Sequence, residues 1–425
     1  MNDRVVISGA GLVCSLGLSA SETWEAVLAG KCGINRIDSF DAQGIACPVA
    51  AQVHGLGPSE LDIHPRDSRI MDIHSYMLMK SGRDAFKHAH LESGHVPPED
   101  IGYFAGMGMV DYNIDDLLPS VLQSLDGEGR VDYDKFYSTA YQQIHPLWPL
   151  SMLNNINFCQ VAIDLGIKGE NTTFSPHADS GAHAVIEAYN SVIEGKAKVA
   201  LAGGVSEKVS PLSIARALWS GLLNTDNNHD VQCRPFGMNR KGTVLGEGSG
   251  TISLELQSTA DKRGIPPLAS ITGYGASFET VEGTNCPTSK AIFLSMEQAI
   301  AKANIRPSDI DLIIAHGDGT FAGDKNEIEA IHHVFSNTID KVNVYSSKGA
   351  LGHMLAGASA VDVVLGIYII KNGIIPAVCN ALPVDDSVRF NLVGGGPLKA
   401  NPRHVLINSR SSEGQCASLI IEAAD

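Results

Sequence analysis

Cysteine is sparse in this chain of 425 residues, and its few thiols are scattered. None of the eight lies in a CxxC pair, and no secretory leader precedes them. We therefore expect reduced, buried thiols in a cytoplasmic protein, rather than disulfides or a metal site. The cysteines are Cys14, Cys32, Cys47, Cys159, Cys233, Cys286, Cys379 and Cys416.

Basic residues are also in short supply. Lys and Arg number 31 against 47 Asp and Glu, which gives a formal net charge of −16. Nucleic-acid binding requires a basic surface, so this balance argues against a nucleic-acid partner. An acidic protein partner would need a local basic patch, or a second subunit that supplies one. Apolar runs end well short of the about 20 residues of a membrane-spanning helix, so we expect no membrane partner.

A dinucleotide-binding fingerprint is incomplete near the start of the chain. Residues 4–14 read as a buried strand followed by a glycine turn. Gly9-Ala10-Gly11 lacks the third glycine of that fingerprint, and the acidic residue expected about 20 positions further on is missing. We therefore expect a tight strand-to-loop turn and no cofactor.

The chain does contain a turn, a helix and a strand in immediate succession over residues 171–207. Apolar residues between 182 and 193 follow one helical face, Gly195 ends the helix, and Val199–Leu201 begins a strand. Residues 178–181 therefore lie at a helix N-terminus. Unpaired backbone N–H groups there can lower a thiol pKa and stabilise an oxyanion, provided that a nucleophile is present. No nucleophile is evident in this turn.

Several motifs accompany this turn in a fixed order. They are Pro176 to Gly181 before the helix, Ala202-Gly203-Gly204 and Glu207 after it, Arg234-Pro235-Phe236, Gly246 to Gly250, His316-Gly317-Asp318-Gly319-Thr320 with Gly323-Asp324 and Glu327, and Lys348 with Gly352-His353. The set resembles the Thr-Ala-Cys-x-x-Gly, PFD…GEGAG, HGTGT…GDxxE and KxxxGH motifs of the β-ketoacyl synthase branch of the thiolase superfamily. The resemblance runs over nearly the whole chain.

Two departures from the family pattern bear on activity. Ala178 stands where the resemblance puts the acyl-accepting cysteine, so no acyl-enzyme can form there. The family's C-terminal Asn-Ser-Phe-Gly-Phe-Gly-Gly loop aligns with residues 408–414, whose two aromatic gate positions are polar here. Cys416 follows this loop in the last strand, where we expect an inert buried thiol rather than a substitute nucleophile.

The resemblance implies roles for the remaining site residues. His316 and His353 would donate hydrogen bonds to a thioester carbonyl as it becomes an enolate. Lys348 would bias the protonation of both histidines, and Glu327 would hold either the lysine or the loop. The implied substrate-binding positions are Ser412 and Gly414 in the C-terminal loop, and Met107.

The second half of the chain repeats the first in outline. Residues 268–276 echo the opening strand and glycine turn, and residues 360–373 echo the helix at 184–195. Together with the resemblance, this repeat predicts a duplicated α/β fold of the thiolase type, with α-β-α-β-α layers and two pseudo-symmetric halves. The expected halves are 1–262, with an insertion at about 62–150 that contains a helix at 75–88, and 263–425.

Three functions are compatible with these residues. The first is the non-condensing subunit of a heterodimeric ketosynthase, resembling the chain-length factors of type II polyketide or aryl-polyene systems. The second is a malonyl-carrier-protein decarboxylase that uses His316 and His353. The third is an active condensing enzyme whose cysteine was replaced by alanine in the laboratory. Pro176-His177 and the polar gate loop favour natural loss, whereas the intact histidines have no obvious use in a purely structural subunit.

The first function implies two partners. One is a cysteine-bearing ketosynthase homologue, bound through the strand and helix around residues 155–195. The other is an acyl carrier protein, which we expect the homologue to recruit because this chain is acidic. Residues 105–150 would close the far end of the homologue's acyl tunnel and so set the product length.

Overall fold

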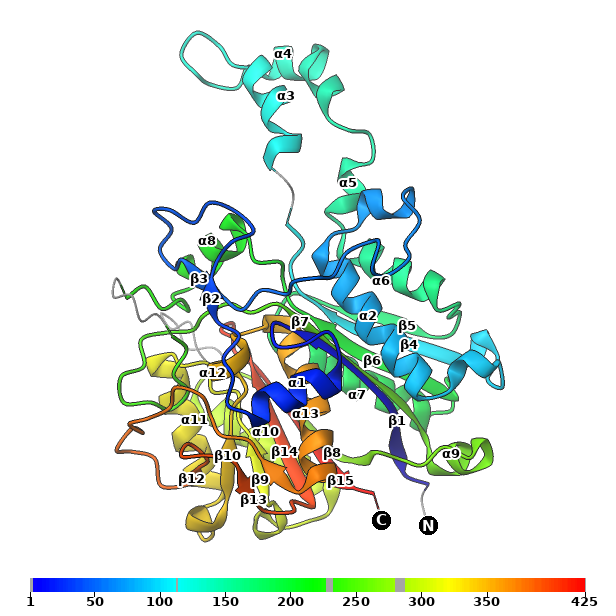
Figure 1. The fold of residues 1–425 in the computed structure, drawn as a ribbon, viewed down its shortest axis with the longest axis vertical. Coiled ribbons are helices and arrows are strands. Elements are labelled where there is room, and N and C mark those ends of the chain that lie inside the picture. Colours follow the sequence, from blue (N-terminus) through cyan, green and yellow to red (C-terminus); the bar gives the residue numbers. More distant parts are fainter. Residues whose placement is uncertain (1–2, 112–113, 227–231, 280–286, 425) are drawn as a thin grey trace.

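The computed structural model describes residues 3–111, 114–226, 232–279 and 287–424, and their strands form a mixed sheet of eleven strands (Figure 1). The first half of the chain contributes β1 (Val5–Cys14), β4 (Ile101–Met107), β5 (Asn171–Phe174), β6 (Val199–Val205) and β7 (Gly248–Leu256). The second half contributes β8 (Ala269–Phe278), β9 (Leu312–Ile314), β10 (Asn343–Tyr345), β12 (Asn391–Leu392), β14 (His404–Arg410) and β15 (Gln415–Ala423). Two small sheets pair β2 (Asn35–Arg36) with β3 (Val49–Ala50), and β11 (Ile374–Ile375) with β13 (Leu398–Lys399). Cys286 lies outside the described residues.

The two halves of the main sheet have the same topology. The strand order is β12-β10-β9-β14-β15-β8-β1-β7-β6-β4-β5. From the centre outwards, the first half runs β1-β7-β6-β4-β5 and the second half runs β8-β15-β14-β9-β10. In both halves, the strands counted in chain order therefore follow the spatial order one, five, four, two, three, and β12 is an additional strand at one edge. β1 and β8 join the halves by antiparallel pairing of Val6 with Ser270. The repeat seen in the sequence therefore corresponds to two halves whose strands are arranged in the same order. The division of the chain at residue 262 stays a prediction.

Helices form three layers around the two halves of the sheet. They are α1 (Ala20–Leu28), α2 (Ile73–His88), α3 (Leu118–Gln123), α4 (Tyr133–Ser138), α5 (Trp148–Ser151), α6 (Asn154–Asp164), α7 (Ser180–Ile193), α8 (Pro211–Trp219), α9 (Gln257–Arg263), α10 (Ser289–Ala303), α11 (Phe321–Val334), α12 (Lys348–Leu351) and α13 (Ala358–Asn372). α2 and α6 cover the outer face of the first half, and α10 and α11 cover that of the second. α7 and α13 pack on the inner faces of both halves. These α-β-α-β-α layers confirm the predicted thiolase-like fold.

α13 is strongly apolar because it lies inside the protein. Residues 355–372 are long and apolar enough to cross a membrane by length and composition, but 72% of this segment is buried. The buried residues of α13 occupy all sides of the helix. A helix that is apolar all round and packed between two sheet faces is typical of the core of a large protein.

Close backbone contacts bring the two central helices against the strands. A Cβ on Gly250 of β7 would lie 2.6 Å from the backbone of Ala360 in α13. A Cβ on Gly181 of α7 would lie 2.7 Å from the carbonyl oxygen of Ala356, just before α13. Atoms this close would overlap, so both positions require glycine. The N-termini of α7 and α13 consequently meet in the middle of the molecule.

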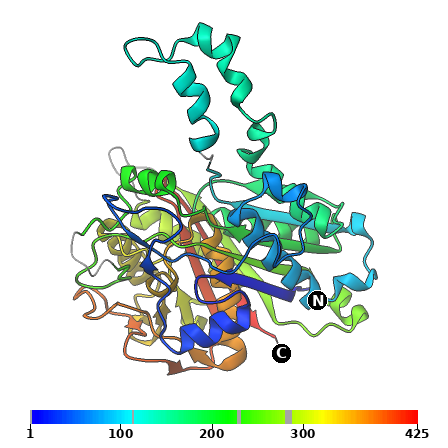
Figure 2. The ribbon, with the colours of Figure 1, turned by 45° about the horizontal axis from the view of Figure 1, so that its top comes forward.

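The predicted insertion at 62–150 is too wide. Its first part holds α2, close to its predicted bounds, and the strand β4, and both belong to the core. Both carry the apolar side chains that complete the outer layer, whereas the polar, irregular composition is confined to the later part. The excursion begins after β4 and rises from the body of the protein with α3, α4 and α5 (Figures 1 and 2). We call residues 114–152 the arm.

The surface of the arm combines these polar residues with many exposed apolar side chains. Its exposed large apolar side chains are Ile114, Leu118, Leu122, Val131, Tyr133, Tyr137, Tyr141, Leu147 and Met152. Tyr133 and Tyr137 are each 69% exposed. Apolar side chains gathered in this way on one projection are typical of an interaction surface.

Candidate active site

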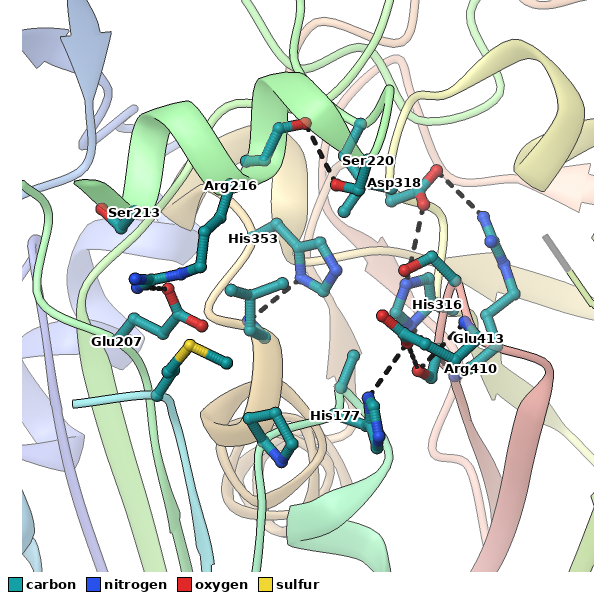
Figure 3. Close-up of a pocket in the computed structure, with 18 residues that line it drawn as sticks. His177, Glu207, Ser213, Arg216, Ser220, His316, Asp318, His353, Arg410 and Glu413 are labelled. Atoms are coloured by element: carbon teal, nitrogen blue, oxygen red, sulfur yellow. Dashed lines mark hydrogen bonds and ion pairs between the residues drawn. The ribbon is translucent and has the colours of Figure 1, made fainter. Parts of the chain in front are cut away.

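The turn before α7 opens into a cavity of about 140 Å³ whose walls come from both halves of the chain (Figure 3). Four of the residues predicted for the site line this cavity: Ala178, His316, His353 and Ser412. Ala178 is only 5% exposed and lies two residues before the first residue of α7. The expected helix N-terminus is therefore present, and its side chain at the nucleophile position is a methyl group.

His316 and His353 converge on this cavity. Their rings are nearly perpendicular, with centroids 4.9 Å apart. Nδ1 of His316 accepts a hydrogen bond from the backbone N–H of Arg410 at 3.3 Å. Nδ1 of His353 accepts one from the backbone N–H of Leu355, also at 3.3 Å. Since a neutral imidazole carries one proton, both rings hold it on Nε2, where it is available for donation.

Both histidines are neutral in the folded protein. Burial lowers the pKa of His316 well below its usual value, and the positive charges of Arg410 and Lys348 lower it further. Burial also lowers the pKa of His353 to about 3, against the opposing effect of Asp318. Such rings are hydrogen-bond donors at neutral pH, rather than cations.

Glu327 holds the loop that carries His316. Its carboxylate accepts hydrogen bonds from the backbone N–H groups of His316 and Gly317, both at 2.8 Å. Glu327 lies on α11 and is fully buried, so these bonds fix the end of β9 against that helix. Glu327 was expected to hold either Lys348 or the loop. These contacts show that it holds the loop.

Lys348 lies behind the cavity and is paired with a residue that the sequence reasoning missed. Its ammonium group lies 2.5 Å from the carboxylate of Asp362, and both side chains are buried. Asp362 also accepts a hydrogen bond from Ser347 at 2.6 Å. Asp362 could have been recognised from the sequence, because it is the single carboxylate in the apolar run of α13 and a buried charge requires a partner of opposite charge.

Two residues that depart from the family motifs form a buried ion pair beside the histidines. Arg410 stands at the first gate position of the C-terminal loop, and Asp318 stands where the HGTGT motif has threonine. Their side chains are 2.9 Å apart and at most 4% exposed. A buried guanidinium held by a carboxylate occupies the place of a movable aromatic ring, so this wall of the cavity is polar and fixed.

A second pair of departing residues lies at the edge of the same cavity. His177 replaces the alanine before the family's cysteine, and Glu413 replaces a glycine of the C-terminal loop. Nδ1 of His177 lies 3.1 Å from the Glu413 carboxylate. Both side chains line the cavity and are partly exposed, so they bind the helix turn to the C-terminal loop across its opening (Figure 3).

Two of the predicted substrate-binding residues do not line the cavity. Met107 is fully buried in the outer apolar cluster that β4 shares with α2, and Met109, beyond the strand end, lines the cavity instead. Gly414 forms the turn into β15, where its N–H donates to the Ser411 carbonyl. Cys416 is buried in the outer cluster of the second half, away from the cavity, which agrees with an inert thiol.

An ion-paired network forms the opposite wall and was not foreseen. Arg216 of α8 lies 2.7 Å from Glu207 and 2.6 Å from Asp111. Glu207 and Arg216 line the cavity, whereas Asp111 lines a larger neighbouring cavity of about 540 Å³ at the base of the arm. Burial raises the pKa of Glu207, and the nearby Arg216 opposes this shift. The network therefore separates the two cavities with charged groups.

The fold and this cavity define a thiolase-like α/β protein. Residues 2–260 match the family described as "Beta-ketoacyl synthase, N-terminal domain", and residues 268–382 match "Beta-ketoacyl synthase, C-terminal domain". The chain therefore belongs to the β-ketoacyl synthase family.

Relatives and solved structures agree with this membership. A 3-oxoacyl-[acyl-carrier-protein] synthase 2 of Staphylococcus aureus (strain COL) is 26% identical over 422 residues, which span 99% of this chain and 98% of the relative. The structure of the ishigamide ketosynthase/chain length factor aligns over the whole of both chains, with a TM-score of 0.87 and 26% identity. A type II PKS acyl carrier protein in complex with its ketosynthase gives a TM-score of 0.84 over the whole of both chains at 22% identity, which shows the fold alone.

The neutral state of His353 predicts how stability depends on pH. Unfolded histidine binds a proton near pH 6.5, whereas His353 binds one only at about pH 3 in the folded protein. Between these values the unfolded state holds more protons, so the free energy of unfolding falls as pH is lowered, by about 1.4 kcal/mol per pH unit. We expect His353→Gln to flatten this slope by about that amount in urea unfolding between about pH 6.5 and pH 4.5.

His145→Gln, at an exposed position on the arm, is the matched control and leaves the slope unchanged. Equal slopes for the parent and His353→Gln would contradict a histidine that is buried in its neutral form.

Proposed function

We propose that this chain is the non-condensing, chain-length-factor subunit of a heterodimeric β-ketoacyl-[acyl carrier protein] synthase. One observation carries the proposal: four positions that depart from the family pattern pair with one another around Ala178. Arg410 pairs with Asp318, and His177 pairs with Glu413. The cavity is thus built consistently around a site without a nucleophile.

Ala178 excludes condensation by this chain alone. A condensing enzyme holds its acyl chain as a thioester before a malonyl-derived carbanion attacks it, and a methyl side chain cannot form that bond. The cavity of about 140 Å³ is also walled by the Glu207 and Arg216 ion pair on one side and by Arg410 on the other. Charged walls disfavour a growing apolar chain, because their desolvation by hydrocarbon is costly.

Natural loss of the cysteine explains these contacts better than a laboratory exchange does. Replacing one cysteine by alanine leaves the surrounding family residues in place. Here Arg410 and Asp318 are both changed, and each neutralises the other's buried charge. Changing either one alone would remove the buried charge that balances the other, which typically costs several kcal/mol. The paired changes therefore support a chain that has long functioned without the nucleophile.

The partner in this proposal is a cysteine-bearing homologue bound around residues 155–195. β5 is the edge strand of the sheet at this end, and its first two residues are exposed. An exposed strand edge offers unpaired backbone groups that a second sheet can extend. Leu153 and Ile163, at the two ends of α6, are 46% and 72% exposed. They add apolar area beside that edge, as an interface requires.

The arm supplies a second contact with the homologue. Its exposed tyrosines and leucines would be covered when it lies across the partner, which suits an interface rich in aromatic side chains. In this arrangement, residues 105–150 close the far end of the partner's acyl tunnel and set the product length. The acyl carrier protein docks on the partner, since this chain carries a net charge of −16 and repels another acidic protein. The solved neighbour with a bound carrier protein is compatible with such docking.

The two-chain proposal predicts a shift in product length. Co-expression of this chain with its cysteine-bearing homologue gives a heterodimer whose main product has a defined length. We expect Met109→Trp to keep the heterodimer and shorten the product, because the larger ring takes up space at the tunnel end. Mass spectrometry of the intact complex and of its products measures both effects.

Met238→Trp is the matched control, since Met238 is also an exposed methionine but lies outside residues 105–150. It leaves the product length unchanged. A chain that stays monomeric or homodimeric beside the homologue, or a Met109→Trp complex with unaltered products, would contradict the proposal.

A second candidate function is decarboxylation of malonyl carrier protein, and the two histidines favour it. Both rings hold their proton on Nε2 and converge on the cavity (Figure 3). Loss of CO₂ from a malonyl thioester leaves an enolate, whose oxygen accepts hydrogen bonds from two such donors. This reaction requires no cysteine, so Ala178 does not prevent it.

The decarboxylase candidate predicts slow release of CO₂ from malonyl carrier protein in the presence of this chain. His316→Ala and His353→Ala each reduce the rate by about 10²-fold, as removal of an oxyanion donor does. His95→Ala, at an exposed position outside the cavity, leaves the rate unchanged. A parent rate equal to the uncatalysed background would remove this candidate and leave the structural subunit.

A further inference from the structure

Two cysteines from opposite ends of the chain meet at α12. Cys32 lies in the loop after α1, and its thiol donates a hydrogen bond to the Gly349 carbonyl at 3.5 Å. Cys379 follows β11, and its thiol lies 3.8 Å from the carbonyl oxygens of both Gly30 and Lys31. The Cys379 sulfur therefore lies against the backbone that immediately precedes Cys32, and the Cys32 sulfur lies against Gly349 of α12.

The contacts around Gly349 hold the two segments close together. The Cys379 carbonyl packs so tightly on Gly349 that no Cβ would fit there. The neighbouring Asn380 donates to the Gly349 carbonyl at 3.1 Å, which is the oxygen that Cys32 also contacts. Gly33 donates its N–H to the Ala350 carbonyl at 2.8 Å. The two cysteine-bearing segments therefore both contact the single turn of α12.

The two thiols differ in exposure. Cys32 is exposed and Cys379 is partly buried. Burial, and secondly the neighbouring Cys32, raise the pKa of the Cys379 thiol to about 11. That effect of one sulfur on the other is a further sign of their proximity. Oxidants consequently reach Cys32 first, and Cys379 is placed to react with its product.

We propose that Cys32 and Cys379 form a reversible redox pair that closes to a disulfide when the protein meets a peroxide. Cys32 attacks hydrogen peroxide to give a sulfenic acid and one water. The Cys379 sulfur then attacks the Cys32 sulfur, forming the S–S bond and releasing a second water. Two thiols are oxidised by two electrons in total, and one peroxide is reduced. A dithiol reductant reverses the reaction.

The disulfide would act on the turn that leads to the cavity. Gly349 lies between Lys348, whose charge lowers the pKa of both cavity histidines, and His353 itself. Oxidation removes the thiol proton that Cys32 donates to Gly349, and it ties the loop after α1 to the segment after α13. The cross-link restricts local opening of α12, because both flanking segments are then joined covalently. This inference does not depend on the proposed subunit function.

The test uses the purified full chain with hydrogen peroxide, followed by N-ethylmaleimide in denaturant and digestion without reductant. We expect mass spectrometry to find one cross-linked peptide pair that contains Cys32 and Cys379, and its loss after dithiothreitol. In hydrogen-exchange measurements, the amides of α12 exchange several-fold more slowly in the oxidised chain than in the reduced chain.

Cys32→Ser and Cys379→Ser each abolish the cross-link and the slower exchange. Cys159→Ser, which removes the exposed thiol on α6, leaves both in place and is the matched control. The proposal is overturned if Cys32 is oxidised to a sulfinic acid while Cys379 is recovered as its maleimide adduct. It is also overturned if the only bridges join Cys32 residues of two different chains.

Discussion

The contact between the two central helices is the constraint on which the rest of the molecule depends. Gly181 at the start of α7 packs on the carbonyl of Ala356, just before α13. Because each half of the chain contributes one of these helices, this contact fixes both N-termini at one point. Ala178 precedes one helix and His353 precedes the other, so the cavity forms where the duplicated halves meet.

Charge explains how the cavity persists without its nucleophile. In an intact site, the helix N-terminus and the histidines would stabilise negative charge on a bound thioester. Here the same groups remain, and the Arg410 and Asp318 pair closes the side that aromatic residues would gate. Lys348 is balanced by Asp362 in the same way. Both of these buried cations therefore have a carboxylate partner, which stabilises the fold. The histidines are neutral because they are buried beside these positive charges.

Motif order predicted the main elements of the site, whereas side-chain direction could not be read from the sequence. The turn at Ala178 and the convergence of His316 and His353 followed from helix periodicity and from the family pattern. Met107 was predicted to bind substrate but lies outside the cavity; β4 is buried on both faces and shows no alternation that reveals which way a side chain points. The pairing of Arg410 with Asp318 was also beyond reach, since it joins two loops that are distant in sequence. The width of the insertion was misjudged because a polar stretch was extended over the core elements α2 and β4.

In the proposed heterodimer, covalent chemistry belongs to the partner and not to this chain. The most direct measurement is the intact mass of each chain after the heterodimer is mixed with an acyl-loaded carrier protein. We expect an acyl adduct on the cysteine-bearing homologue and an unmodified mass for this chain. An acyl adduct on this chain that maps to the peptide covering residues 171–190 would contradict it.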